Sequence, residues 1–455
     1  MKKVFAIGAA ACLLCGIPVA ASQEADQAET GIDMIERARD MVGNFFAGDD
    51  ISAGRHFDEA MKKAAPPEML KMIRDGLAKQ VGPFKEMTST RVERSGGYVI
   101  VYVACMFEKA KLDARVVFNA EGEIAGLNFV PHVESTEYRT PSYARPESFR
   151  ETEVEVGDGE WALPGTLSMP QGTGPFPAVV LVHGSGPNDR DETIGPNRPF
   201  KDIAWGLASR GIAVLRYDKR TKVHGQKIVM NPDLASRLTV FEETVEDALA
   251  AADLLRKTDG IDASRIFILG HSLGGMLIPR IAAADERTAG FIALAGLTRP
   301  LPETMLQQTR YILGLKGTLS EEEKKHLAEM EEQVARINAL DPVKDIPGER
   351  IMGAFPAYWL DLRGYDPPAE IRNDARPLFI LQGGRDYQVT KQDFENWKTG
   401  LEGRRKTAFK LYPKANHLFM EGEGLITPNE YLYVAGHVAE AVIDDIADWI
   451  AGRVD

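Results

Sequence analysis

The pattern of hydrophobic and polar residues differs between the start of the chain and the rest. Over residues 32–131, apolar side chains first recur at helical spacing and later form short runs that predict strands. The helical spacing covers residues 34–46 and 67–77. The expected strands are residues 98–107, 111–118 and 124–129. Helices followed by successive strands predict a small α+β domain.

Residues 135–150 contain prolines and predict a linker, after which the pattern changes. Two strand-like runs flank a Gly-Asp-Gly turn at residues 157–159, which predicts a hairpin. The continuous apolar run at residues 178–182 is typical of a strand buried on both faces. Further helices are expected at residues 203–208, 245–255, 276–283 and 438–450, and further strands at residues 212–215, 266–269, 291–295, 378–381 and 409–412. This alternation predicts an α/β domain over residues 151–455, with a mostly parallel sheet between layers of helices.

A long insertion interrupts the alternation at about residues 298–374. A serine followed by three glutamates at residues 320–323 predicts the start of a helix that continues to about residue 340. The insertion also contains Phe355, Tyr358 and Trp359. A helical insertion after a sheet strand predicts a lid, and its aromatic residues predict an apolar pocket.

Composition indicates a folded protein with more than one domain. The chain has 455 residues, of which 44% are hydrophobic and 27% are charged. The formal net charge of −13 argues against nucleic acid as a partner, because a phosphate backbone is bound by a basic surface.

The first 21 residues have the parts of a secretory signal peptide. Two lysines precede an apolar run, and small residues at positions 19–21 form a cleavage site. We therefore expect a protein exported to the periplasm or the extracellular space, with no membrane contact after cleavage. No lipid anchor is expected, because neither Cys12 nor Cys15 has the preceding residues of a lipidation signal. Cleavage would leave Cys105 as a single buried cysteine without a disulfide partner.

Residues 270–274 read Gly-His-Ser-Leu-Gly and predict a nucleophile, Ser272. The G-x-S-x-G pattern is weak alone, but here it directly follows an expected buried strand and directly precedes an expected helix. The motif requires this strand–turn–helix context, because the sharp turn exposes the serine hydroxyl. A serine hydroxyl is a poor nucleophile unless a base removes its proton.

His417 is the predicted base among the eight histidines, because it follows a late strand at the sheet edge where α/β proteins place ligands. The side chain of His271, next to the serine, is expected to point away from the base position. The acid should lie between serine and histidine in chain order. Asp386 follows a buried strand and a glycine turn, and would fix the tautomer of His417. Asp366 is a weaker rival, because it precedes two prolines and follows no strand.

A tetrahedral intermediate needs N–H donors for its oxyanion. The backbone N–H of Leu273, directly after the serine, is the first predicted donor. The second is expected in the His-Gly-Ser-Gly-Pro turn at residues 183–187. We prefer the N–H of Ser185, with that of Gly186 as the alternative, since the following proline has no N–H.

These motifs resemble the α/β-hydrolase superfamily in their order and spacing over about residues 150–455. The matching positions are residues 183–184, 270–275, 383–386 and 416–417. The chain is similar to the exported branch of esterases, dienelactone-hydrolase-like enzymes and serine aminopeptidases, in which the Arg-Tyr-Asp-Lys-Arg run at residues 216–220 is also typical. We interpret that run as structural or as lining the site, with Arg220 as a candidate for substrate contact. Residues 32–131 resemble, by pattern alone, the small cone-shaped domains found ahead of such hydrolases.

The resemblance implies a serine hydrolase, and we interpret the chain as an enzyme that cleaves small carboxylic esters through an acyl-enzyme. The alternative is a serine peptidase for short peptides, which needs a carboxylate to hold a substrate ammonium group. Asp189, Asp191 and Glu192 are candidates, although we expect their loop to be a solvated rim. A second alternative is a binding module on a hydrolase scaffold. The sequence contains no metal or cofactor motif, and oligomerisation through the N-terminal domain stays open.

Overall fold

A computed structural model describes residues 24–95, 98–132, 138–315, 317–346 and 348–453. The described chain forms two compact units, residues 24–132 and residues 138–453. The expected signal peptide at residues 1–21 lies outside the described residues. None of the helices in the described part combines the length and the apolar character needed to cross a bilayer.

The N-terminal unit is an antiparallel sheet with helices that pack on it. Its helices are α1 (Glu24–Ala47), α2 (Asp50–Ala53), α3 (Glu59–Ala64) and α4 (Pro67–Val81). Its sheet has the order β1 (Phe84–Ser95), β2 (Tyr98–Phe107), β3 (Lys111–Phe118) and β4 (Ile124–Pro131). The core is built largely of aromatic and β-branched side chains and includes Cys105, which is a free, buried thiol. Burial raises the pKa of the Cys105 thiol to about 12, so it behaves as an apolar group.

The sequence pattern missed two features of this unit. Strand β1 was not expected, because its sequence FKEMTSTRVERS mixes charged and hydroxyl side chains. An edge strand tolerates such residues, since it pairs with β2 alone. Helix α1 begins at Glu24, ten positions before the expected helical spacing at residues 34–46, because alanine and glutamate favour helix even in a polar segment.

The C-terminal unit contains an eight-stranded sheet in the order β12-β11-β10-β9-β7-β8-β6-β5. The strands are β5 (Phe149–Val156), β6 (Leu163–Pro170), β7 (Phe176–Val182), β8 (Ala213–Tyr217), β9 (Ile261–His271), β10 (Gly290–Leu294), β11 (Leu378–Gly383) and β12 (Thr407–Tyr412). Strands β7 to β12 are parallel, and the β5–β6 hairpin pairs antiparallel to β8. The predicted fold class is therefore confirmed: a mostly parallel α/β sheet preceded by a small α+β domain.

Strand β7 shows why the sequence reads as a continuous apolar run. Val179 and Leu181 face one hydrophobic core, while Val180 and Val182 face another on the opposite side of the sheet. The first core contains α5 (Pro199–Ala208) and α18 (Glu440–Ile450). The second contains α9 (Glu246–Arg256), α11 (Ile278–Ala284) and α16 (Lys391–Gly400).

The other helical segments outside the insertion are short. They are η1 (Pro146–Ser148), η2 (Gly159–Trp161), α6 (Arg220–Val223), α7 (Gly225–Val229), α8 (Pro232–Arg237), the π-helical turn η3 (Phe241–Val245), α10 (Leu273–Met276) and α17 (Pro428–Tyr433).

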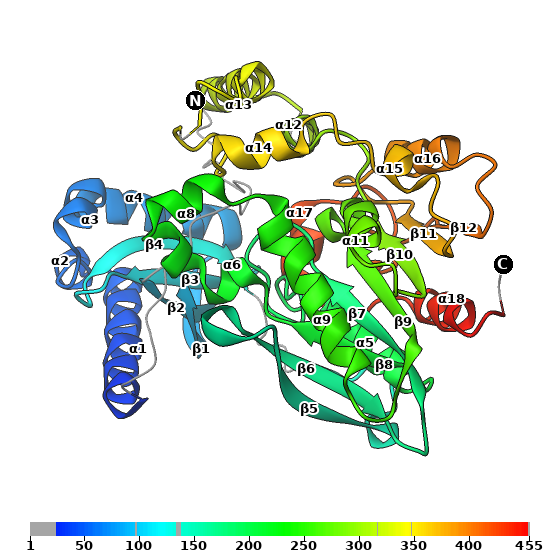
Figure 1. Ribbon diagram of the computed structural model, residues 1–455. Coiled ribbons are helices and arrows are strands. Elements are labelled where there is room, and N and C mark those ends of the chain that lie inside the picture. The colour runs from blue at the N-terminus through cyan, green and yellow to red at the C-terminus, as the bar shows by residue number, and fades with distance from the viewer. Residues whose placement is uncertain (1–23, 96–97, 133–137, 316, 347, 454–455) are drawn as a thin grey trace. The chain divides into compact units, whose positions relative to one another are not determined.

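The insertion between β10 and β11 consists of helices. They are α12 (Leu301–Gly314), α13 (Glu321–Ala339), α14 (Pro356–Leu362) and α15 (Pro367–Ile371), and Figure 1 shows α12, α13 and α14 gathered together at the top of the view. Helix α13 starts with a capping box between Ser320 and Glu323, as the run of acids predicted. The expected role of the aromatic residues is corrected in part. Trp359 is a core side chain that donates to the carbonyl of Ile351, and Tyr358 bonds Glu243.

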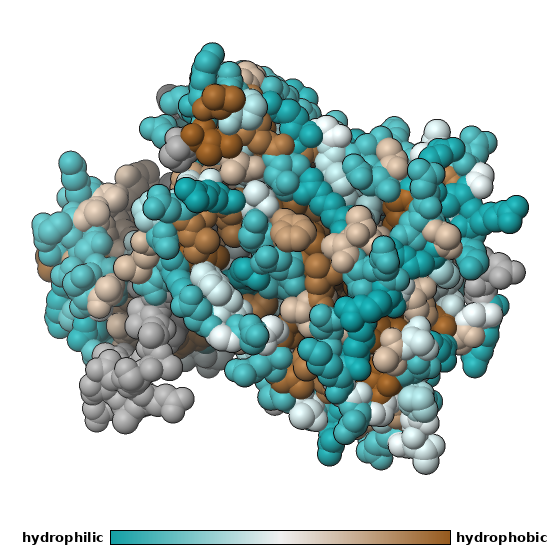
Figure 2. All heavy atoms as spheres, viewed as in Figure 1, coloured by the Kyte–Doolittle hydropathy of each residue, from teal (hydrophilic) through white to brown (hydrophobic). Residues whose placement is uncertain are grey.

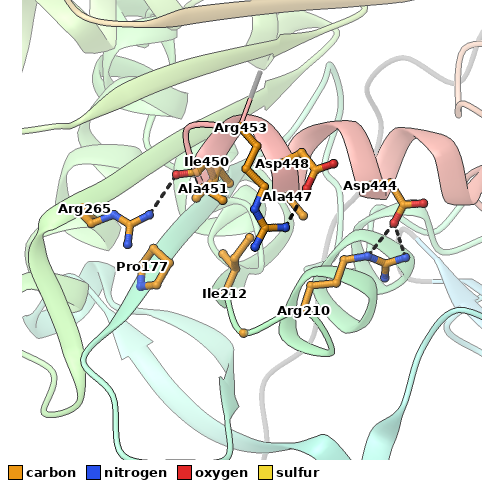
Figure 3. A pocket seen from close by; sticks show the side chains of 11 residues that line it. Pro177, Arg210, Ile212, Arg265, Asp444, Ala447, Asp448, Ile450, Ala451 and Arg453 are labelled. Carbon is orange, nitrogen blue, oxygen red and sulfur yellow. Dashed lines mark hydrogen bonds and ion pairs between the residues drawn. The ribbon is translucent and has the colours of Figure 1, made fainter. Parts of the chain in front are cut away.

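The amino ends of the parallel strands border a cavity, whereas the carboxyl ends are followed by the predicted site residues. A cavity of about 320 Å³ lies where the strands begin, between Pro177, Ile212 and the last turns of α18 (Figure 3). Its three arginines are occupied, since Arg210 pairs with Asp444, Arg453 pairs with Asp448, and Arg265 donates to the carbonyl of Ile450. The predicted site residues instead follow the carboxyl ends of strands. On the face drawn in Figure 2, hydrophilic side chains predominate and hydrophobic ones show in separate small areas.

Candidate active site

Ser272 lies in a sharp turn between β9 and α10. Its backbone has φ +54° and ψ −114°, a conformation that side-chain-bearing residues rarely adopt. The turn is possible because Gly270 and Gly274 let the backbone cross at close range, where a Cβ on either would overlap a carbonyl group. Ser272 is partly exposed, and its hydroxyl makes no hydrogen bond with a described residue. The strand–turn–helix context expected for the motif is present.

His417 and Asp386, which are 31 positions apart, form a buried hydrogen-bonded pair. His417 Nδ1 lies 2.6 Å from Asp386 Oδ2, and the two residues are 4% and 7% exposed. The other carboxylate oxygen of Asp386 accepts the backbone N–H groups of Gln388 and Val389. The carboxylate is thus held by its own turn while it orients the imidazole. Among the described residues, none bonds His417 Nε2, which leaves that nitrogen available.

The loops that present these two residues are joined by a second set of contacts. Arg385 makes a bidentate ion pair with Glu430, at 3.0 and 2.8 Å. Glu430 also accepts a hydrogen bond from the amide of Asn416, the residue before His417. These contacts tie the turn of Asp386 to the turn of His417. Asp366, the weaker rival for the acid, instead caps the N-terminus of α15.

The turn at residues 183–187 lies directly against the serine. A Cβ placed on Gly184 would lie 3.1 Å from the Ser272 Cβ. The N–H groups of Leu273 and Ser185 make no hydrogen bond with a described residue outside their own elements. Two unpaired N–H groups near one serine are the arrangement that an oxyanion requires.

Glu192 corrects the expectation that residues 188–192 form a solvated rim. It is 2% exposed and has φ +51°. Its Oε1 accepts the Gly184 N–H at 2.7 Å, and its Oε2 lies 2.7 Å from Nδ1 of His271. The loop therefore turns its last carboxylate inward, where it binds the turn at residues 183–187. A single charged residue in a polar loop gives no periodic signal, which is why the sequence did not reveal this role.

His271 also differs from expectation, because its ring does not point away from the base. The ring centroids of His271 and His417 are 4.6 Å apart, and His271 Nε2 lies 2.9 Å from the His417 carbonyl oxygen. Both ring nitrogens of His271 thus face acceptors, a carboxylate and a carbonyl. Only the doubly protonated imidazolium donates to both.

The ionised form of this pair is also favoured electrostatically. Burial alone would lower the pKa of His271, but attraction to Glu192 outweighs it and raises that pKa above its usual value. Burial likewise opposes ionisation of Glu192, yet attraction to His271 and their hydrogen bond hold its pKa below the usual value. Glu192 and His271 therefore form a buried ion pair that links the turn at residues 183–187 to the backbone of His417.

Other candidates from the sequence have structural partners. His183 is buried, and its Nε2 lies 3.0 Å from the Asp189 carbonyl oxygen. Burial lowers the pKa of His183 to about 4, which makes it a neutral residue that orders its loop. Arg220, considered for substrate contact, instead pairs with Asp247 and Glu246.

A cavity of about 440 Å³ borders Asp386 below helix α12. Its wall includes the stacked rings of Tyr311 and Tyr387, whose centroids are 4.7 Å apart. Within the described residues, no three His, Cys, Asp or Glu side chains are grouped so that they could hold a metal ion. The groups beside Ser272 are two histidine–carboxylate pairs and backbone N–H groups, and of the two pairs only Asp386–His417 has a ring nitrogen without a partner among the described residues.

Comparison with known proteins places both parts of the chain. Residues 179–424 match the α/β-hydrolase family, and residues 38–127 match a family described as a protein of unknown function, DUF3887. The esterase EstD of Thermotoga maritima is 42% identical over 388 residues, which are 84% of this chain and 87% of that relative.

Solved structures of hydrolases also match, at lower similarity. Est1E from Butyrivibrio proteoclasticus is 16% identical with a TM-score of 0.43, over 66% of this chain and 98% of its own. An esterase from Pyrobaculum calidifontis is 16% identical with a TM-score of 0.43, over 67% of this chain and 85% of its own. The predicted class of enzyme, an esterase-type hydrolase, is confirmed by the family match and the extended identity to EstD. The chain belongs to the α/β-hydrolase family.

Proposed function

We propose that the chain hydrolyses carboxylic esters through an acyl-enzyme intermediate on Ser272. The observation that supports this most directly is the 2.6 Å contact between His417 Nδ1 and Asp386, which leaves Nε2 free as a base. Catalytic hydrogen bonds to serine often form fully only when substrate binds, so a free serine hydroxyl fits an unliganded site.

The residues would act in two half-reactions. Ser272 Oγ attacks the ester carbonyl carbon while His417 Nε2 takes the hydroxyl proton, and Asp386 stabilises the imidazolium. The N–H groups of Leu273 and Ser185 hold the oxyanion. The tetrahedral intermediate then breaks down, and the alcohol leaves with the proton from His417. A water molecule deprotonated by His417 then attacks the acyl-enzyme, and His417 returns the proton to Ser272 Oγ as the acyl–oxygen bond breaks and the carboxylic acid leaves.

Three carboxylates were considered for binding a substrate ammonium group, and their existing contacts favour an ester over a peptide as substrate. Glu192 is bound to Gly184 and His271, and Asp191 pairs with Arg216. Asp189 accepts backbone N–H groups within its own loop. These three carboxylates therefore already have partners. The similarity to an esterase points the same way.

The decisive experiment compares Ser272→Ala with Ser264→Ala, which changes an exposed serine on β9, the strand that precedes Ser272. We expect Ser272→Ala to lower turnover of p-nitrophenyl butyrate by about 10⁴-fold or more and to abolish labelling by a fluorophosphonate. Ser264→Ala should keep both. Turnover retained by pure Ser272→Ala would contradict the proposal, and preferential cleavage of aminoacyl naphthylamides would favour the peptidase.

We also propose that the protein is exported and that cleavage occurs near residue 21. The proposal depends on the composition of the first 21 residues. Expression of the full chain in a Gram-negative host, followed by N-terminal sequencing of the periplasmic fraction, tests it. An intact N-terminus in the cytoplasmic fraction would contradict it.

A further inference from the structure

Lys219 is a buried lysine behind the turn that contains Ser185. Its side chain is 2% exposed. The ammonium nitrogen lies 2.9 Å from the Gly184 carbonyl oxygen and 3.3 Å from Glu243 Oε1. Removing an ammonium group from water is unfavourable unless it is both paired and hydrogen-bonded. Both kinds of partner are present, and one of them is the backbone of the proposed oxyanion turn.

The contact with Gly184 determines where the next N–H points. The carbonyl of Gly184 and the N–H of Ser185 belong to one planar trans peptide, so they point in opposite directions. Lys219 holds the carbonyl toward the buried side, which directs the N–H toward the exposed side of the turn. Ser185 is exposed, and its N–H makes no hydrogen bond with a described residue. The ammonium also withdraws electron density from the carbonyl, which strengthens the N–H as a donor.

Gly184 is also fixed at its other polar atom. Its N–H donates to Glu192 Oε1 at 2.7 Å, so buried ionised groups of opposite sign hold the two sides of the residue. The side-chain amide of Asn188 donates to the Gly184 carbonyl over a longer distance of 3.3 Å. The backbone N–H of Lys219 donates to the Asn188 carbonyl. The turn is therefore preorganised before any substrate arrives, and preorganisation is what makes an oxyanion hole effective.

We propose that Lys219 is a positioning residue of the oxyanion hole, which orients and polarises the Gly184–Ser185 peptide toward the oxygen of the reacting carbonyl. This inference rests on the proposed function. Lys219 does not touch the substrate, and it acts through the backbone of Gly184.

The same lysine connects this turn to the lid. Glu243 lies in the π-helical turn η3 and accepts a hydrogen bond of 3.0 Å from the hydroxyl of Tyr358 in α14. A chain of contacts thus runs from the lid helix through Glu243 and Lys219 to Gly184. Because π-helical turns are frequent at functional sites, the placement of Glu243 fits this role.

The test uses Lys219→Met, which keeps an unbranched side chain of nearly the same length and removes the charged terminal group. We expect kcat for p-nitrophenyl butyrate to fall on the order of 10- to 100-fold with little change in KM, since loss of a whole donor costs roughly 10²- to 10³-fold. The matching thionoester provides the specific readout. Sulfur accepts hydrogen bonds weakly, so its turnover depends less on the oxyanion hole. The ratio of ester to thionoester turnover should therefore contract about 10-fold.

Glu243→Gln is the matched control, because it breaks the same ion pair but leaves the Lys219–Gly184 hydrogen bond in place. We expect it to keep the ester-to-thionoester ratio within about threefold of the wild type, as the peptide keeps its orientation. Lys227→Met, which removes an exposed ion pair with Glu160, should leave both rates unchanged. If Lys219→Met does not fold, the double variant with Glu243→Met removes both charges and should show the same contraction.

The outcomes separate this inference from the proposed function. If Ser272→Ala is inactive while Lys219→Met keeps the wild-type kcat, or loses ester and thionoester turnover equally, the role of Lys219 is wrong and the esterase proposal stands. If Ser272→Ala hydrolyses esters, the proposed function itself fails.

Discussion

Two carboxylate–histidine pairs lie side by side in this protein, and they differ in what the second nitrogen of each ring faces. In Asp386–His417, Nδ1 meets the carboxylate and Nε2 is free of partners among the described residues. In Glu192–His271, Nδ1 also meets the carboxylate, but Nε2 meets the His417 carbonyl. The free nitrogen of the first pair can accept a proton, whereas both ring nitrogens of the second pair already have partners. Proximity of an acid and a histidine therefore does not by itself identify a base.

The pairs also differ in how the chain builds them. Asp386 and His417 each follow a strand of the parallel sheet and meet at its carboxyl edge. Glu192 comes from an irregular loop and reaches His271 at the end of β9. The second pair binds both the turn at residues 183–187 and the backbone of His417. It acts as a support on which the proposed catalytic groups rest.

Of the substitutions in the two pairs, replacement of the proposed base should lower kcat the most. His417→Gln removes the proton acceptor, and we expect kcat for p-nitrophenyl butyrate to fall by about 10⁴-fold, as in other serine hydrolases that lose a triad member. The thermal midpoint should change little, which calorimetry checks. A variant that keeps more than a tenth of wild-type turnover would exclude His417 as the base.

Neutralising the supporting pair should have a smaller effect. Glu192→Gln keeps an oxygen that can accept the Gly184 N–H but leaves His271 without a counter-ion. We expect kcat to fall about 10-fold, because the oxyanion turn loosens while both its donors remain. His271→Gln should cost about as much, and the double variant no more than either alone, since both break one contact. Additive losses would show that the residues act separately.

The stability that the supporting pair provides should depend on pH in a defined direction. Attraction to Glu192 raises the pKa of His271, so its contribution is complete below the unfolded value of about 6.5. It is lost as pH rises through the higher folded pKa, when the ring gives up one of its two protons and can no longer donate to both the Glu192 carboxylate and the His417 carbonyl. Urea unfolding should therefore separate the wild type from His271→Gln most at pH 6 and less at pH 9.5. A difference that grows with pH would contradict the ion pair.

On the acid side, the lowered pKa of Glu192 predicts that its contribution is lost only as pH falls through that lowered value.

Removing the contact of Glu430 with Arg385, which ties the Asp386 turn to the His417 turn, should have the smallest effect on kcat and stability. Glu430→Gln removes the charge that Arg385 pairs with but keeps an oxygen for Asn416. We expect a loss of about 1 kcal/mol in unfolding free energy and a few-fold fall in kcat. Glu423→Gln, at an exposed ion pair nearby, serves as the control and should change neither. Equal effects of the two substitutions would show that the Arg385 contact has no special role.

The sequence predicted the fold class because the alternation of buried strands and amphipathic helices is a local property. It also placed Ser272, Asp386 and His417 at the carboxyl ends of strands, and the structure brings Asp386 and His417 together. The roles of these residues stay predictions until the variants are measured. The sequence did not predict the polar edge strand β1, because its pairing with β2 rather than its own composition makes it a strand.

Tertiary structure alone decided the surroundings of Ser272. In the sequence, Glu192 is one acid of a polar loop and Lys219 is one cation of a basic run, and either could equally be solvated. Only the folded chain shows that both side chains turn inward onto Gly184. The physical reason is that hydrophobic spacing repeats along the chain, whereas burial of a charge depends on a partner far away in sequence. The sequence determined the sheet and the residues at its edge, and the fold decided which charges hold them in place.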